Sequence, residues 1–134
     1  MSAITDLHTL LANLEPQLQP QEYVFCCVPG LLSDYTQLNP LAAFSEKEGM
    51  TLVLEANAAQ QAGFDSATTY RQITLNVHSA LDAVGLSAAV ADTLAAADIS
   101  ANIIAAFYHD HVFVPSNKAE QALSALQALS ADNQ

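Results

Sequence analysis

Basic residues are scarce in this sequence. Its 134 residues include three Lys+Arg, namely Lys47, Arg71 and Lys118, against fourteen Asp+Glu, and the formal net charge is -11. Three cations cannot neutralise a row of phosphates, so the composition argues against nucleic acids and against anionic membrane surfaces as partners. Small molecules and proteins remain as the classes of partner.

Long apolar runs are also missing. No stretch approaches the roughly 20 apolar residues that cross a bilayer, and residues 1–6 combine neither a basic start nor a continuous apolar segment. We therefore expect a cytoplasmic protein with no membrane-spanning segment. The hydrophobic content of 51% is nevertheless enough for one sizeable core, or for two small sub-domains that share one.

Motifs for nucleotide chemistry and nucleophilic catalysis are absent too. The sequence has no GxxxxGK phosphate loop and no dinucleotide fingerprint. Ser79 follows His78 but lies outside any nucleophile-elbow pattern, and neighbouring residues on a strand face opposite ways. We therefore expect no cofactor and no enzyme activity.

Cysteine and histidine do not form a complete set of metal ligands. Cys26 and Cys27 are adjacent, so on a strand they point to opposite faces, and we expect two core thiols rather than a disulfide. His109 and His111 flank Asp110, but no second Cys/His pair lies at ligand spacing. We expect a solvated hairpin turn there and no metal, with a histidine metal site as the alternative.

The first half of the chain alternates helix and strand signals. Gly49 can supply a positive φ in a hairpin turn, and Asn57 and Gly63 are suited to begin and to end a helix. In chain order we expect a helix over 3–14, a strand buried on both faces over 23–28, a loop over 29–40, a hairpin of 42–46 with 50–55, and a helix over 57–63.

The second half has the order βαββα. Gln72, Thr74 and Asn76 alternate with apolar residues, which predicts a strand with one buried face. Asn117 and Glu120 form a capping-box-like pair before the last helix. We expect a strand over 72–77, a helix over 85–97, a hairpin of 101–108 with 112–114, and a helix with apolar residues from 119 to 129. Antiparallel sheets with helices on one face give an α+β architecture.

Several of these segments resemble a known family. The stretches Ile73–Leu86, Ala97–Ile104 and Tyr108–Pro115 resemble an ACT domain. Glu22–Cys26 and Glu48–Leu54 extend the resemblance to a family of small uncharacterised bacterial proteins built as tandem ACT-like domains. The resemblance implies a ferredoxin-like βαββαβ fold, with an N-terminal ACT-like sub-domain over 1–66 and a C-terminal ACT domain over 67–134. The second half lacks a final strand, so the two related sub-domains are either sequential or interleaved.

The resemblance also implies a ligand site where the first strand of the second half meets its helix. Carried onto this chain, the ligand-binding positions are Asp82, Ala83, Val84, Gly85 and Leu86 in the loop, with Asn102, Ile103 and Ile104 on the neighbouring strand.

The residues themselves allow two interpretations at each of three positions. Gly85 either exposes backbone N–H groups that bind a carboxylate at the helix start, or serves close packing. Asp82 either caps that helix or pairs with a ligand ammonium group. Asn102 either contacts the polar end of an amino acid or satisfies a turn. If Gly85 is a binding position, Gly85→Val should cost more binding than stability.

We therefore expect an amino-acid-binding sensor or regulatory module that self-associates as a homo-oligomer. Because the regulated enzymes of the family carry a catalytic domain and these 134 residues show none, we expect either that a regulatory output passes to an unknown protein partner or that there is no such output. The alternative is a structural oligomerisation or protein-interaction module that binds no ligand. Both expectations come from analogy of fold rather than from a catalytic or binding motif.

Overall fold

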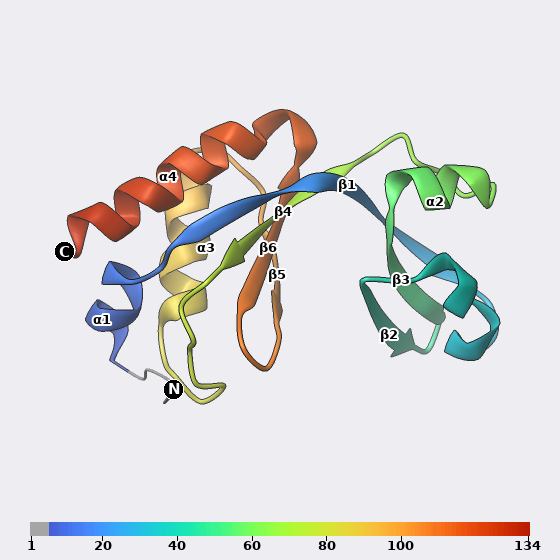
Figure 1. Ribbon diagram of the computed structural model, residues 1–134, viewed down its shortest axis with the longest axis horizontal. Helices are drawn as coiled ribbons and strands as arrows, with labels where there is room; N and C mark the ends of the chain where they lie inside the picture. The colour runs from blue at the N-terminus through green and yellow to red at the C-terminus, as the bar shows by residue number, and fades with distance from the viewer. Residues whose placement is uncertain (1–5) are drawn as a thin grey trace. The chain divides into compact units, whose positions relative to one another are not determined.

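The computed structural model describes residues 6–134 (Figure 1). The chain forms two compact units: unit 1 combines residues 71–134 with the described part of residues 1–20, and unit 2 is Gln21–Tyr70. One long strand, β1 (Pro16–Val28), begins in unit 1 and ends in unit 2. The strand order is β2-β3-β1-β4-β6-β5, so β1 contributes to the sheet of both units.

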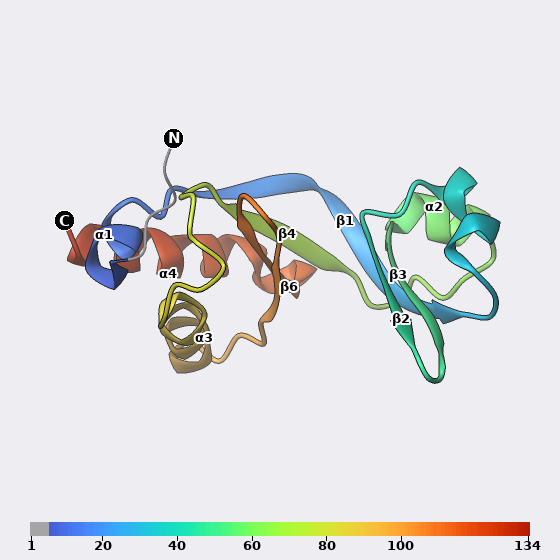
Figure 2. The ribbon, with the colours of Figure 1, turned by 90° about the horizontal axis from the view of Figure 1, so that it is seen from below.

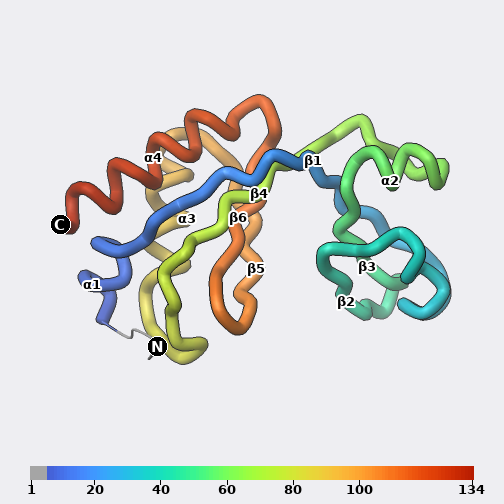
Figure 3. The backbone as a smooth tube through the Cα atoms, in the orientation of Figure 1, coloured from blue at the N-terminus to red at the C-terminus, as the bar shows by residue number. Residues whose placement is uncertain are grey.

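Unit 1 has the predicted βαββα order after β1. Its elements are α1 (Leu7–Ala12), the first part of β1, β4 (Tyr70–Leu75), α3 (Leu86–Ala96), β5 (Asn102–Ala105), β6 (Asp110–Pro115), a 3-10 turn (Ser116–Lys118) and α4 (Ala119–Asp132). The first part of β1 runs beside β4 (Figure 3), although Gln19 and Thr74 are 55 positions apart. The order β1-β4-β6-β5 is that of a ferredoxin-like βαββαβ unit in which β1 takes the place of the final strand.

Helices α1, α3 and α4 pack on one face of the unit 1 sheet (Figure 2). Helix α3 places Leu86, Val90 and Leu94 at a spacing of four residues, so all three are buried on one side. Removing this apolar surface from water is the main force that holds the helices on the sheet. The core also includes Leu10, Leu11, Leu14, Ile73, Leu75, Val77, Ile99, Val112, Val114, Ala119, Ala122 and Leu126.

Unit 2 is a three-stranded antiparallel sheet with one short helix. It contains the second part of β1, two 3-10 turns (Leu32–Asp34 and Thr36–Leu38), β2 (Ala42–Glu46), β3 (Gly49–Glu55) and α2 (Ala56–Gln61). The predicted hairpin is confirmed: Glu46 pairs with Gly49, whose φ is +149°. A small core of Val24, Val28, Leu52, Leu54 and Ala59 joins the sheet to α2.

Several N-terminal predictions differ from the structure. The helix expected over 3–14 is described as Leu7–Ala12, and positions 3–5 lie outside the described residues. The strand expected over 23–28 begins at Pro16, because pairing with β4 extends it through two prolines that local signals read as a stop. This strand is not buried on both faces, since Phe25 and Cys27 are exposed. Cys26 is half-buried, so the prediction of two core thiols is also wrong.

The polar face of β4 is another correction. Gln72 and Thr74 were expected to face solvent but are 7% and 6% exposed. Both lie within hydrogen-bond distance of His111 Nδ1, at 3.0 and 3.1 Å, and Gln19 Nε2 donates to Thr74 Oγ1 at 3.0 Å. The buried hydroxyl and amide groups are therefore satisfied by neighbouring strands, which removes the cost of their burial.

The hairpin turn and the helix caps also differ from the expectation. The β5–β6 turn is closed by Ala106 N–H donating to His109 O at 3.1 Å, so His111 lies in strand β6 and not in the turn. Asn57 lies inside α2, whose N-cap is Glu55. The capping box expected from Asn117 is absent, because a 3-10 turn precedes α4. The division of the chain into 1–66 and 67–134 stays a prediction.

Candidate functional site

A small pocket lies where the loop after β4 enters α3. We call it the α3 pocket; its volume is about 130 Å³. It is lined by Ser79, Ala80, Leu81, Ala83, Gly85, Leu86, Ser87, Ala88, Ala105 and Asp110. All of these residues belong to unit 1, so one compact unit forms the whole pocket.

Gly85 begins helix α3 with a backbone that favours glycine. Its φ is +100°, and it is the N-cap of α3, where no side chain makes a capping hydrogen bond. Ala89 N–H donates to Gly85 O at 2.9 Å, which starts the helical hydrogen bonds. The N–H groups of the first turn have no acceptor within a helix, and their residues, Leu86, Ser87 and Ala88, line the pocket. This end of the helix carries a partial positive charge.

The same geometry changes what a substitution at Gly85 can test. A Cβ at this position would lie 3.0 Å from Leu7 Cδ2, and its positive φ would be strained for any other residue. Gly85→Val would therefore mainly destabilise the fold, which is the outcome expected when the glycine serves backbone conformation and packing. The substitution cannot separate binding from stability.

Asp110 supplies a carboxylate to the same pocket. It is the first residue of β6 and pairs with Ala105 of β5. It is half-buried, and this desolvation raises the pKa of its carboxyl above the ordinary value of 3.8, with smaller opposing effects from His111 and His109. Within residues 6–134 the carboxylate has no hydrogen bond or ion pair, so it remains available to a cationic group.

The α3 pocket therefore combines a partial positive charge with a negative charge. The helix start offers N–H donors and a partial positive charge, while Asp110 offers a negative charge. A molecule that carries a carboxylate and an ammonium group matches both features at once. The scarcity of Lys and Arg makes backbone N–H groups the main means of binding an anion in this chain.

The predicted ligand positions divide into two groups in the structure. Ala83, Gly85 and Leu86 line the α3 pocket. Asp82 and Val84 belong to the same loop and are exposed, but they do not line it. Asp82 does not cap α3, because Gly85 is the N-cap.

The three positions predicted on the neighbouring strand lie elsewhere on β5. Asn102 pairs with Phe113, Ile103 packs against the unit 1 core, and Ile104 pairs with His111. None of the three lines the α3 pocket, to which β5 contributes Ala105 instead. In the sequence Asp110 is noticeable as a carboxylate between two histidines, but the sequence could not show that it lies beside a loop about 30 positions earlier.

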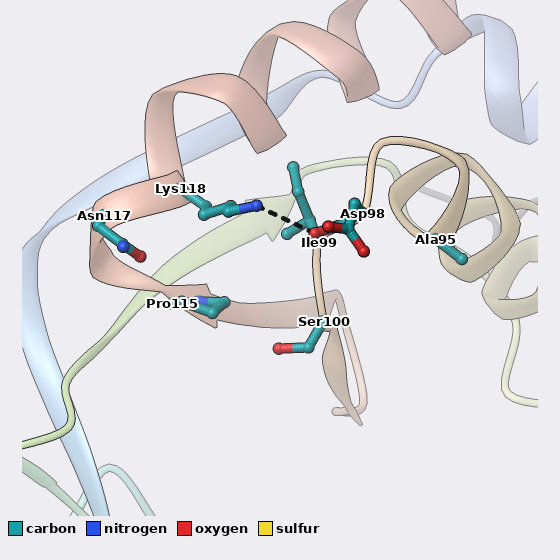
Figure 4. Close-up of a pocket in the computed structure, with 7 residues that line it drawn as sticks. All are labelled: Ala95, Asp98, Ile99, Ser100, Pro115, Asn117 and Lys118. Carbon is teal, nitrogen blue, oxygen red and sulfur yellow. Dashed lines mark hydrogen bonds between the residues drawn. The ribbon is translucent and has the colours of Figure 1, made fainter.

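Two larger hollows lie elsewhere on the chain. One, of about 430 Å³, is lined by Ala95, Asp98, Ile99, Ser100, Pro115, Asn117 and Lys118 (Figure 4). There Lys118 Nζ donates to Asp98 O at 3.2 Å, so the ammonium group binds a carbonyl just after the end of α3. The other, of about 480 Å³, lies in unit 2 beside the edge-to-face pair of Phe25 and Tyr70. Over the described residues, the hollow in unit 2 contains no helix start, whereas the one beside Lys118, the N-cap of α4, also includes Asp98.

The histidines are engaged by the fold rather than gathered around a metal. His111 Nδ1 faces Gln72 and Thr74, and desolvation lowers the pKa of His111 below its ordinary value of 6.5. His109 Nδ1 lies 3.4 Å from Val77 O. Among the described residues, no group of three His, Cys, Asp or Glu is placed to hold a metal ion. None of the helices over the same residues is long and apolar enough to cross a membrane.

Comparisons with known structures show the fold. A Vibrio cholerae protein of unknown function, described as a possible transport protein, is 57% identical, with a TM-score of 0.83 over 88% of this chain and 91% of that chain. The ligand-free regulatory subunit of aspartate kinase from Thermus thermophilus is 13% identical, with a TM-score of 0.65 over 85% of this chain and 95% of that chain. A protein from Agrobacterium tumefaciens is 14% identical, with a TM-score of 0.64 over 86% of this chain and 87% of that chain.

Comparisons of sequence show the family. No curated protein gives a significant match. Two ACT domain family models match in tandem, one over residues 2–71 and the other over residues 67–128. ACT domains are regulatory, ligand-binding modules rather than catalytic domains. The two matches together cover both halves of the sequence, and the chain belongs to the ACT domain family.

Proposed function

We propose that this chain binds a free amino acid in the α3 pocket and acts as a regulatory module that is not itself an enzyme. One observation supports this most directly: the start of α3 and the unpaired carboxylate of Asp110 line the same pocket of about 130 Å³. The ligand carboxylate would accept hydrogen bonds from the first-turn N–H groups, and its ammonium group would pair with Asp110.

Binding of the standard amino acids, measured one by one by isothermal titration calorimetry, tests the proposal. Asp110→Asn keeps the shape of the side chain and removes its charge. We expect it to weaken binding roughly 10- to 100-fold, because a hydrogen bond to a charged group contributes about 1.5–3 kcal/mol. Asp82→Asn is the matched control, since Asp82 is an exposed carboxylate of the adjoining loop that does not line the pocket.

Each outcome of this titration has one meaning. Binding that falls in the Asp110 variant and persists in the Asp82 variant supports the site. Binding that is unchanged in both places the ligand elsewhere. Failure of every amino acid to bind the parent protein rejects the proposal and favours an interaction module that has no ligand.

Self-association is the second part of the proposal. Four large apolar side chains, Leu81, Val84, Phe107 and Tyr108, are each at least 63% exposed. They lie in the loop after β4 and in the β5–β6 turn, two segments whose His78 and Tyr108 rings have centroids 5.3 Å apart, and exposed apolar side chains that gather on one surface are typical of an interaction site. The net charge of -11 opposes association, so added salt should strengthen a homo-oligomer by screening the repulsion. Light scattering that finds a monomer at all salt and protein concentrations would reject this part.

A further inference from the structure

We infer that unit 2 carries a second ligand site, which binds quaternary ammonium compounds such as choline. The site is the hollow beside Phe25 and Tyr70, which we call the unit 2 hollow. Its lining residues all lie between positions 24 and 70 and so belong to unit 2. The site and its test are therefore independent of the α3 pocket and of the function proposed for that pocket.

The unit 2 hollow runs along one edge of β1. Residues 24–27 of this strand all line it, and successive side chains of a strand point to opposite faces of the sheet. A hollow that meets four consecutive residues therefore follows the edge of the strand. β3 pairs with the same residues along the other edge, and the segment 64–70, which leads from α2 into β4 (Figure 1), supplies the remaining wall.

Aromatic rings contribute to both walls of the hollow. The rings of Phe25 and Tyr70 have centroids 5.5 Å apart and planes at 78°, so the two rings stand nearly at a right angle. Phe64, half-buried against the core of unit 2, adds a third ring from the segment after α2. The face of an aromatic ring is the negative end of its quadrupole and attracts a cation. Rings at a steep angle can contact one cation from different sides.

The charge around the hollow also favours a cation. Asp65 contributes a carboxylate to the lining, and its Oδ1 accepts a hydrogen bond from Ala67 N–H at 2.9 Å, which holds the carboxylate in place. Among the described residues that line the hollow, none is Lys or Arg. Residues 21–70 include six Asp+Glu against one cation, Lys47. An anion would therefore be repelled here, whereas a cation is attracted by Asp65 and by the rings.

The lining favours a methylated ammonium group over a primary one. A primary ammonium group has three N–H donors, which need acceptors once they leave water. Apart from Asp65, the side-chain oxygens of the lining are the hydroxyls of Thr68 and Tyr70, and the rest of the lining is rings, thiols and Val24. A quaternary ammonium group has no N–H donor, and its methyl groups bury apolar surface against rings and sulfur atoms. The hollow therefore matches a positive charge that is covered by methyl groups.

Titration with choline and with 3,3-dimethylbutan-1-ol tests the inference, because the two molecules share one shape and differ in one charge. Isothermal titration calorimetry of the full chain should show that choline binds about 5- to 30-fold more tightly, the factor that a partly desolvated cation–π contact contributes. Equal affinities would overturn the inference, because an apolar hollow without cation selectivity takes both molecules. The absence of saturable choline binding at millimolar concentrations would overturn it as well.

Variants of Phe25 test whether choline binds at the rings. Phe25 is 39% exposed, so Phe25→Leu, which keeps an apolar side chain of similar bulk, should fold. It should weaken choline binding about 5-fold or more, whereas Phe25→Tyr, which keeps the ring, should bind choline as the parent does. Phe44→Leu is the matched control, since Phe44 is an exposed ring of unit 2 that does not line the hollow. Choline binding that persists unchanged in Phe25→Leu would overturn the assignment of this site.

Two further readouts test the carboxylate and the location. Asp65→Asn should weaken the binding of choline and leave that of the neutral alcohol unchanged, whereas Glu48→Gln, at an exposed carboxylate of unit 2 outside the hollow, should change neither. Cys27 is exposed and lines the hollow, so saturating choline should slow its modification by N-ethylmaleimide. Bound choline that leaves the labelling rate of Cys27 unchanged would lie elsewhere on the chain and would overturn the inference.

Discussion

The conformation of Gly85 makes a quantitative prediction about stability. Alanine at this position must adopt a φ of +100°, and a non-glycine residue held in such a region costs about 1–3 kcal/mol. The new Cβ would also lie 3.0 Å from Leu7 Cδ2 and 3.6 Å from Leu7 Cδ1, closer than the roughly 3.5–4.0 Å at which carbon atoms attract. Because a leucine methyl can shift, the strain should dominate, and Gly85→Ala should lower the free energy of unfolding by about 1–3 kcal/mol.

Gly63 offers a control for this measurement. Its φ is +84°, but a Cβ there would meet nothing within 4 Å. Urea unfolding of Gly63→Ala therefore reports backbone strain alone, and any larger loss in Gly85→Ala reports the contact with Leu7. Shortening the neighbour in Leu7→Ala/Gly85→Ala should remove the excess. An unchanged or increased stability in Gly85→Ala would refute the argument.

Two further predictions concern the titratable side chains. Because the pKa of Asp110 is raised by burial, its folded form holds a proton more tightly, and this contribution to stability is lost as pH rises from about 3.8 through the folded-state pKa. The stability of Asp110→Asn relative to the parent should therefore increase over that range, and a difference independent of pH would contradict it. Thiol labelling should modify exposed Cys27 before Cys26, whose pKa is raised by burial. If the faster of the two labelling phases of the parent protein is still present in Cys27→Ser, this prediction is wrong.

Local patterns located the loop and the helix start that line the α3 pocket, whereas the resemblance to ACT domains pointed to them as ligand positions. The loop after β4 and the start of α3 were located from a glycine that precedes apolar residues at helical spacing, Leu86, Val90 and Leu94. These signals depend on neighbouring residues and so can be read from one segment. Asp110 could not be assigned to the pocket, because strand pairing between β5 and β6 decides which of three consecutive polar residues faces the loop. The two predicted positions Asp82 and Val84 are exposed for a similar reason, since loop direction follows no simple period.

The βαββα order of the second half and the hairpin at Gly49 could be predicted from periodicity and turn chemistry, which depend on residues close together in the sequence, and the family from segments that resemble ACT domains. Tertiary structure alone decided that Pro16–Pro20 continues β1 as the strand beside β4, since that pairing joins segments more than 50 positions apart. It also decided that Gln72 and Thr74 are buried, because hydrogen bonds with His111 satisfy them there. Long-range pairing overrides local polarity wherever a neighbouring strand supplies the hydrogen bonds that water would otherwise provide.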